Sequence, residues 1–282
     1  MIRSTDATAQ VDGDGATGHV GAWFATNLVI ELAKRSGVGA VGLVRAADIF
    51  MLGAYAEHIA LQGLAGMVFT NSIPTRVHPT GGLDPLIGTN PVAFGLPVSQ
   101  GQPVVVDFAT SASAIGHVRI ASYTDSAIPA GIALDRDGEP TTNAKAALAG
   151  SLEPLGGAKG YGIGLAAALM SGPLIGAMLG EELKETLGKQ NVLPERGHLF
   201  LAIDPGAFSD PAQSRQRIRR HLDEIKRSRK AHGIEEILIP GERSFRARER
   251  SLASGIDILE SVWKNTLVIA RDLGVTPPSR LA

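Results

Sequence analysis

Hydrophobic residues near the start of the chain recur with helical spacing in two segments, each followed by a glycine and a short apolar run. The apolar positions that share a helical face are Val20, Phe24, Leu28 and Leu32 in residues 20–34, and Met51, Tyr55 and Ile59 in residues 50–62. Gly37 and Gly63 are typical helix stops, and residues 38–44 and 64–70 are predicted to be buried strands. Helix, glycine and strand, twice in succession, predict an α/β layer structure.

The next segment, residues 71–103, is interrupted by so many glycines and prolines that we expect loops without regular elements. Loops on a rigid scaffold are common sites of ligand binding. A short buried strand is predicted at 103–107, where it ends on Asp107.

Residues 160–180 carry no charge and are mostly apolar, about the length of a membrane helix. Glycines interrupt the stretch, and Ser171-Gly172-Pro173 is a strong helix stop. We therefore predict a buried helix, a break and a second short buried helix, and no membrane partner. The first residues lack the apolar core of a signal peptide, so we do not expect export.

The last third of the chain is predicted to hold a strand at 199–203, a helix at 211–232, a further strand at 237–239, and helices from 246 to 273 broken near Gly255. The 211–232 helix is strongly basic. Its basic residues are Arg215, Arg217, Arg219, Arg220, Lys226, Arg227, Arg229 and Lys230. We favour a solvated basic face with an apolar stripe in the core over nucleic-acid binding, because no aromatic residues interleave the charges.

Composition removes several kinds of chemistry. The 282 residues contain no cysteine, which excludes disulfides, thiolate nucleophiles, iron–sulfur clusters and cysteine-ligated zinc. The net charge of −1 does not favour nucleic acid as a partner. The seven histidines form no spaced pair with a nearby acid, so no metal site is expected.

Polar and glycine-rich loops supply the candidate chemistry. Lys159 lies among the glycines of 156–162, where a cation and free backbone N–H groups suit a phosphate or carboxylate. Asp107 ends a strand, followed by hydroxyls at 110, 111 and 113 whose alternative role is to cap the next helix. His78 is the histidine candidate because it lies in the loop-rich region. No GxGxxG motif is placed between a strand and a helix, so an ordinary Rossmann site is not expected.

Five motifs occur in an order that resembles the type-2 malate/L-lactate dehydrogenase family, which includes ureidoglycolate and sulfolactate dehydrogenases and cyclic-imine carboxylate reductases. They are Asp12-Gly13-Asp14-Gly15, Gly88-Thr89-Asn90-Pro91-Val92-Ala93, Asp107-Phe108-Ala109-Thr110-Ser111, Gly157-Ala158-Lys159-Gly160-Tyr161-Gly162 and the stretch 198–205. The resemblance covers essentially the whole chain. It implies NAD(P)-dependent hydride transfer on a small 2-hydroxy or 2-oxo acid, a non-Rossmann mixed sheet covered by helices, and a cytoplasmic homodimer.

The resemblance also implies where NAD or NADP would bind. The implied cofactor contacts are Ser72, Asp107, Phe108, Ala109, Lys159, Gly241 and Glu242. Asp107 would bind ribose hydroxyls and Lys159 the pyrophosphate. On this basis, residues 1–70 are expected to form part of a scaffold domain, 71–205 the cofactor-binding region, and 206–282 a helical region that packs on the scaffold.

Two departures from the family pattern bear on activity. The chain begins after the point where a helical segment with a Ser-His-Gly motif would lie, so we expect that segment to be lacking. The family's acid/base histidine corresponds to Ile49, which cannot exchange a proton. Asp48 is expected to cap the following helix, and Asp48 or His78 is the candidate replacement proton carrier. Two hypotheses remain open: an active dehydrogenase, or a degenerate paralogue that keeps the scaffold without turnover.

Overall fold

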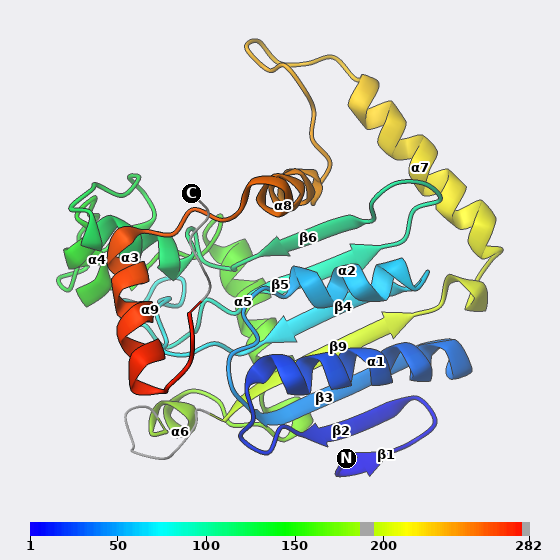
Figure 1. Ribbon diagram of the computed structural model, residues 1–282, viewed down its shortest axis with the longest axis horizontal. Coiled ribbons are helices and arrows are strands. Elements are labelled where there is room, and N and C mark those ends of the chain that lie inside the picture. The colour runs from blue at the N-terminus through cyan, green and yellow to red at the C-terminus, as the bar shows by residue number, and fades with distance from the viewer. Residues whose placement is uncertain (187–194, 278–282) are drawn as a thin grey trace. The chain divides into compact units, whose positions relative to one another are not determined.

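The computed structural model describes residues 1–186 and 195–277, and its central feature is a seven-stranded mixed sheet (Figure 1). In spatial order its strands are β1 (Arg3–Ser4), β2 (Thr8–Asp12), β3 (Val38–Ala46), β9 (Arg196–Ile203), β4 (Ala65–Thr70), β5 (Val92–Leu96) and β6 (Val104–Phe108). β2 and β3 pair in parallel, and the other neighbours pair antiparallel. The predicted mixed α/β sheet is confirmed.

The strand that completes this sheet comes late in the sequence. β9 lies between β3 and β4 and pairs antiparallel with both, so that Phe200 is opposite Val41 on one side and Val68 on the other. All three side chains are fully buried. The strand predicted at 199–203 is therefore the centre of the sheet.

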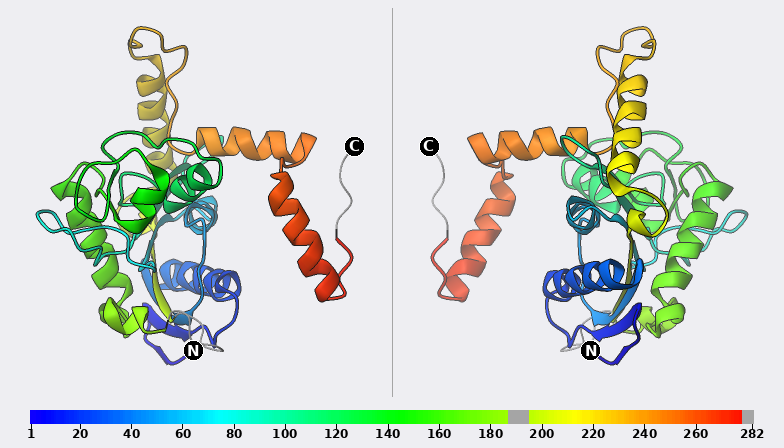
Figure 2. Two further views of the ribbon diagram at one scale, coloured as in Figure 1. Left: turned by 90° about the vertical axis from the view of Figure 1, so that its left-hand side faces the viewer. Right: turned by 90° about the vertical axis from the view of Figure 1, so that its right-hand side faces the viewer.

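Helices cover both faces of the sheet, as the edge-on views of Figure 2 show. α1 (Gly18–Ser36) and α2 (Gly53–Leu61) pack on one face, and α5 (Ala158–Ser171) packs on β4 and β9 from the other. α1 ends at Gly37, whose φ of 80° lets its N–H reach the carbonyl of Ala33.

The predicted face of α1 is buried only in its second half, where Leu32 lies in the core and Leu28 packs against it. Val20 and Phe24 are 64% and 52% exposed, whereas Ala22, Ala25 and Val29 are fully buried. Small side chains face the sheet because the helix lies close to it: a Cβ on residue 39 of β3 would come within 2.6 Å of the carbonyl oxygen of Val29. The helical period was predicted correctly, but close packing selects the alanine-rich side of the helix.

A second, smaller core lies beside the main sheet. It is built by α3 (Ile115–Tyr123), α4 (Ala144–Ala149), β7 (Ala133–Leu134) and β8 (Ser151–Leu152). Val118 and Leu152 are among its buried residues. No sequence pattern predicted a separate core in this region.

The expectation that residues 71–103 contain no regular element is wrong, because β5 lies within them. Val92 and Ala93 are fully buried. Position 95 of the strand is a glycine because α2 passes very close to it. A Cβ on Gly95 would lie 2.0 Å from the carbonyl oxygen of Ala56. A glycine taken as a turn signal is thus a close approach between helix and strand.

The apolar stretch 160–180 contains the predicted break but not a second buried helix. After α5, a 3-10 turn at Pro173–Ile175 has no buried residue, and Leu174 is 69% exposed. A short helix, α6 (Glu181–Lys184), follows. In the parts of the chain that the structure describes, no helix combines the length and the hydropathy of a membrane span.

Two expectations about residues 206–240 are wrong. α7 (Pro211–Arg227), which follows a 3-10 turn at Pro205–Ala207, has no buried side chain, so its apolar stripe does not enter a core, and Ile225 is 36% exposed. Residues 237–239 form no strand, because they lie outside the ladders of both sheets.

The chain comprises two compact units, Met1–Ile239 and Pro240–Ala282. The second unit contains α8 (Glu242–Ser254) and α9 (Glu260–Asp272), and the predicted break near Gly255 is confirmed by the φ of 85° at that residue. The expected boundaries at 70 and 205, and the packing of 206–282 on the scaffold, stay predictions.

Candidate functional site

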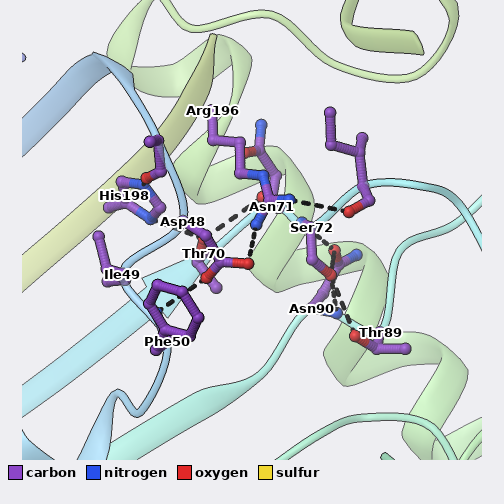
Figure 3. A network of polar contacts seen from close by, with 12 residues as sticks. Asp48, Ile49, Phe50, Thr70, Asn71, Ser72, Thr89, Asn90, Arg196 and His198 are labelled. Carbon is purple, nitrogen blue, oxygen red and sulfur yellow. Dashed lines mark hydrogen bonds and ion pairs between the residues drawn. The ribbon is translucent and has the colours of Figure 1, made fainter. Parts of the chain in front are cut away.

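Polar side chains gather where β4 ends and β9 begins (Figure 3). Because the two strands are antiparallel, the residues that follow Thr70 lie beside the first residues of β9. Asn71 joins the two segments: its Oδ1 accepts from the N–H of Gly197 at 2.8 Å, and its Nδ2 donates to the carbonyl of Met178 at 2.7 Å. The side chain therefore fixes the strand ends relative to the chain after α5.

Ser72 is joined to Asn90, in the loop that precedes β5, by two reciprocal hydrogen bonds that form the Ser72–Asn90 clasp. The Oδ1 of Asn90 accepts from the backbone N–H of Ser72, and the hydroxyl of Ser72 accepts from the backbone N–H of Asn90, each at 2.9 Å. A Cβ at residue 88 would lie 2.1 Å from the carbonyl oxygen of Ser72, so Gly88 makes this approach possible. The hydroxyl of Ser72 is thus held by the loop, half-buried.

The clasp extends to α5 and to the segment after β6. Asn90 donates through Nδ2 to the carbonyl of Gly164 at 3.0 Å, and the Thr110 hydroxyl donates to the carbonyls of Thr89 and Asn90. The alternative in which hydroxyls of 110, 111 or 113 cap the next helix is not what the structure shows. The N-cap of α3 is Ala114, without a side-chain hydrogen bond.

Asp48 lies in the segment between β3 and α2 and forms an ion pair with Arg196. Its Oδ1 also accepts from the backbone N–H of Phe50 at 2.8 Å. Burial acts to raise the pKa of Asp48, but the charge of Arg196 and these hydrogen bonds bring the pKa below its ordinary value. The expected capping role is wrong, because the N-cap of α2 is Leu52 and Asp48 bonds a residue before the helix.

His198 is fully buried and uses both ring nitrogens. Nε2 lies 3.1 Å from the carbonyl of Ala47, which can only accept, so this nitrogen carries the proton. Nδ1 then accepts from the hydroxyl of Thr70 at 2.7 Å. Burial lowers the pKa of His198 to about 4, and Arg196 adds to this effect, so the imidazole is neutral at physiological pH.

Ile49 stands in the middle of this segment with its side chain 1% exposed, in the same apolar cluster as Leu52 and Phe200. The Tyr55 hydroxyl donates to the carbonyl of Ile49 at 3.0 Å. Burial, with a smaller effect of Asp48, raises the pKa of Tyr55 to about 12, so the phenol stays protonated.

His78 lies in the second core rather than in the network around β4 and β9. It is 5% exposed, its Nδ1 lies 2.9 Å from the Ser151 hydroxyl, and its Nε2 lies 3.4 Å from a carboxylate oxygen of Glu153. Both nitrogens face internal partners.

Asp107 is the last residue but one of β6, and its side chain is exposed beside the start of α2. Its Oδ2 accepts from the backbone N–H of Gly53 at 2.7 Å. Packing against the helix raises the pKa of Asp107, while the hydrogen bond from Gly53 acts in the opposite direction. Phe108 and Ala109 follow, both half-buried.

The start of α5 is open to a ligand. Gly156 and Gly157 have φ values of 61° and 68°, and apart from the adjoining backbone no atom of the described residues lies within 4 Å of where their Cβ atoms would be. The first N–H groups of a helix have no partner within the helix, and Lys159 stands beside them with an exposed side chain. This combination fits the pyrophosphate of a dinucleotide.

Gly241 and Glu242 belong to the second unit, where Gly241 is the N-cap of α8 with a φ of 101°. Arg196, Thr70 and Asn71 were not predicted as site residues. Arg196 stands at the start of an apolar strand, but its partner Asp48 is separated from it by 148 residues, and no local pattern connects them. Among residues 1–186 and 195–277, no three His, Asp or Glu side chains are arranged to hold a metal ion.

Comparison with known proteins agrees with the motifs. A family model described as malate/L-lactate dehydrogenase matches residues 1–266. L-sulfolactate dehydrogenase of Methanothermobacter thermautotrophicus is 37% identical over 273 residues, which cover 97% of this chain and 77% of that protein. Delta(1)-pyrroline-2-carboxylate reductase of Ancylobacter novellus is 36% identical over 258 residues, which cover 92% of this chain and 74% of the reductase.

Solved structures give the same result. Malate dehydrogenase from Entamoeba histolytica superposes with a TM-score of 0.93 at 26% identity, over 99% of this chain and 80% of that one. Sulfolactate dehydrogenase from Methanocaldococcus jannaschii superposes with a TM-score of 0.86 at 34% identity, over 97% and 78%. Sequence and fold agree along nearly the whole chain, which therefore belongs to the malate/L-lactate dehydrogenase family.

Proposed function

We propose that this chain catalyses NAD(P)-dependent hydride transfer to or from a small 2-hydroxy or 2-oxo acid, or the corresponding cyclic imino acid. Relatives of the chain are dehydrogenases and reductases. The observation that carries the proposal is the open, glycine-bordered start of α5 with the exposed Lys159, in a chain of this family. A dinucleotide needs such a site for its pyrophosphate.

The residues present fit a nicotinamide cofactor, which when bound supplies or accepts the hydride. Lys159 and the N–H groups of α5 would hold the pyrophosphate, and Asp107 would accept from a ribose hydroxyl through Oδ1, which no described residue bonds. The further residues proposed to contact NAD or NADP are Ser72, Phe108, Ala109, Gly241 and Glu242. The N–H and hydroxyl of Ser72 are bonded to Asn90 and Thr89, so Ser72 would exchange one of these bonds for one to the cofactor.

The proton that accompanies the hydride requires a titratable group near the substrate. Ile49 has none. Of the two sequence candidates, Asp48 is paired with Arg196 and His78 is buried between Ser151 and Glu153. Both stay candidates that mutation can test.

A second function is favoured by the burial of Ile49. A degenerate paralogue would keep the scaffold and dinucleotide binding but not turnover, because an apolar side chain occupies the family's histidine position. Loss of a general acid or base costs about 10²–10⁴-fold in rate.

Two measurements on the purified full chain separate the alternatives. The first is oxidation of NADH and NADPH with a panel of 2-oxo acids and cyclic imino acids, and the second is the change in NADH fluorescence on binding. Turnover supports the enzyme, and binding without turnover supports the paralogue. Absence of both would contradict the proposed function and the alternative alike.

We further propose a cytoplasmic homodimer, as the family resemblance implies. Sedimentation equilibrium tests the dimer directly, and a mass equal to one chain at micromolar concentration would contradict it.

A further inference from the structure

We propose that Asp107, rather than Asp48 or His78, exchanges the proton with the substrate oxygen in this chain. The proposal rests on the proposed function, since the reaction needs a proton carrier and Ile49 cannot be one. It assigns Asp107 a catalytic role in place of ribose binding alone.

Two titratable groups near the segment that carries Ile49, Asp48 and His198, are committed to internal contacts. Asp48 has one oxygen on the N–H of Phe50 and the other on Arg196. His198 is fully buried between Thr70 and the carbonyl of Ala47. His198 cannot reach a bound ligand without breaking these contacts, and Asp48, although its side chain is 47% exposed, is held as the charged partner of Arg196.

Asp107 differs from His198 in being exposed, and from both groups in having one side-chain atom that no described residue bonds. Its side chain is exposed, only its Oδ2 is used, by the N–H of Gly53, and Oδ1 has no hydrogen-bond partner among the residues that the structure describes. An exposed carboxylate near the end of a strand, with only one of its oxygens hydrogen-bonded, can contact a ligand oxygen directly.

Asp107 also lies next to the segment of Ile49. Gly53, which bonds it, is four residues beyond Ile49, where α2 begins. Asp107 is opposite Ala93 on β5, and Ala93 belongs to the same apolar cluster as Ile49. The carboxylate therefore stands at the border of the cluster that buries the residue in the family's histidine position.

The surroundings favour a carboxyl that is protonated more readily than usual. Packing against α2 raises the pKa of Asp107 against the opposing hydrogen bond from Gly53. The elements packed against it carry few titratable groups: α2 has Tyr55, Glu57 and His58, and β5 has none. A raised pKa moves a carboxyl toward the range in which it can donate a proton.

The step balances with a reduced nicotinamide as the hydride source. Reduction of the substrate carbonyl adds a hydride, with its two electrons, at carbon and a proton from the Asp107 carboxyl at oxygen. The products are the 2-hydroxy acid, the oxidised nicotinamide and the Asp107 carboxylate, which takes a proton from solvent. Oxidation runs the same step in reverse, with the carboxylate as base.

Asp107→Asn separates proton transfer from ribose binding. The amide oxygen can still accept from the N–H of Gly53, and the amide can still bond a ribose hydroxyl, but it cannot exchange a proton. We expect kcat to fall by about 10²–10⁴-fold, while the Kd for NADH, measured by fluorescence, stays within about twofold, less than the weakest single hydrogen bond would change it. Asp137→Asn, in an exposed turn, is the matched control and should leave both values unchanged.

Two pH measurements add independent readouts. In the wild-type chain, kcat for reduction should fall as the pH rises through the pKa of Asp107, and this limb should be absent from the residual activity of Asp107→Asn. In the cofactor-free protein with ¹³C-labelled aspartate carboxyls, one resonance should titrate above the ordinary value of 3.8 and be missing from Asp107→Asn.

The outcomes distinguish the two proposals. A wild-type chain that reduces no acid would overturn the proposed function and this inference with it. A wild-type chain that turns over, with Asp107→Asn retaining its kcat, would overturn this inference alone. Weakened NADH binding at unchanged kcat would return Asp107 to ribose binding.

Discussion

Contacts of a few side chains fix the position of the segment between β3 and α2. Ile49 points into the apolar cluster, and the segment itself is fixed by polar contacts on either side of it, from Asp48 to Arg196 and from the carbonyl of Ala47 to His198. A residue at position 49 is therefore part of the core, whatever its role in relatives.

Replacing Ile49 by histidine should lower the free energy of unfolding by about 1–3 kcal/mol, because the imidazole would be buried without a partner. Urea unfolding at pH 8, where the imidazole is neutral, measures this. Ile49→Val is the matched control and should cost about 0.5–1.5 kcal/mol. Unchanged stability together with faster reduction would contradict the prediction, since it would place residue 49 at the substrate.

The buried His198 predicts a pH dependence of stability. Its pKa is about 4 in the folded protein, against an ordinary 6.5, so between these values the unfolded chain binds a proton that the folded protein does not. The resulting stabilisation is fully present above pH 6.5 and is lost as the pH falls toward 4. The shift corresponds to about 3 kcal/mol over that range.

The measurement compares the wild-type chain with His198→Gln by urea unfolding from pH 7.5 to pH 5. The wild-type advantage should shrink by about 2 kcal/mol across this interval. A gap that stays constant with pH would show that His198 is not held neutral in the folded protein.

The candidate site residues that the sequence indicated are those whose signal comes from neighbouring residues. Lys159 among glycines and Asp107 at a strand end are local patterns, and the structure places both at exposed element ends. The contacts of Arg196 and His198 join residues more than a hundred positions apart, and no periodicity or spacing encodes them. A capping role was predicted for Asp48 because the sequence shows that it precedes a helix, but not that Arg196, 148 residues away, is its partner.

Whole elements differ in how much they contribute to the core. α1 has eight buried residues, and α7 has none although it is nearly as long. In both helices the period of the apolar residues was predicted correctly. Which face is covered could not be predicted, because it depends on strands and helices that are distant in sequence.

A pair of leucine substitutions measures this difference between elements. Leu43→Ala on β3 should cost about 2–5 kcal/mol, because the side chain is fully buried. Leu222→Ala on α7 should cost about 1 kcal/mol or less, because that side chain remains half-exposed. Equal losses in urea unfolding would show that α7 is covered in solution.

At the scale of the molecule, the proposed cofactor residues are divided between the two units. Gly241 and Glu242 lie beyond Ile239, and the others precede it. A chain that ends at Ile239 should unfold cooperatively, since it keeps the whole sheet, but should bind NADH about tenfold more weakly, as expected from one lost hydrogen bond. Fluorescence titration measures this affinity.

Glu242→Gln in the full chain is the companion variant, because it removes only the carboxylate. If the shortened chain bound NADH as tightly as the full chain, Gly241 and Glu242 would not belong to the cofactor site. If only the truncation weakened binding, the contribution would come from elsewhere in residues 240–282.

The central position of β9 has a consequence for protein synthesis. β3 and β4 are made early, but the strand that joins them is translated more than a hundred residues after β4. At ribosomal speeds of about 5–20 residues per second, this interval is on the order of ten seconds. Throughout it, the nascent chain has two unpaired apolar strand edges, so this is the stage at which it most depends on chaperones to avoid aggregation.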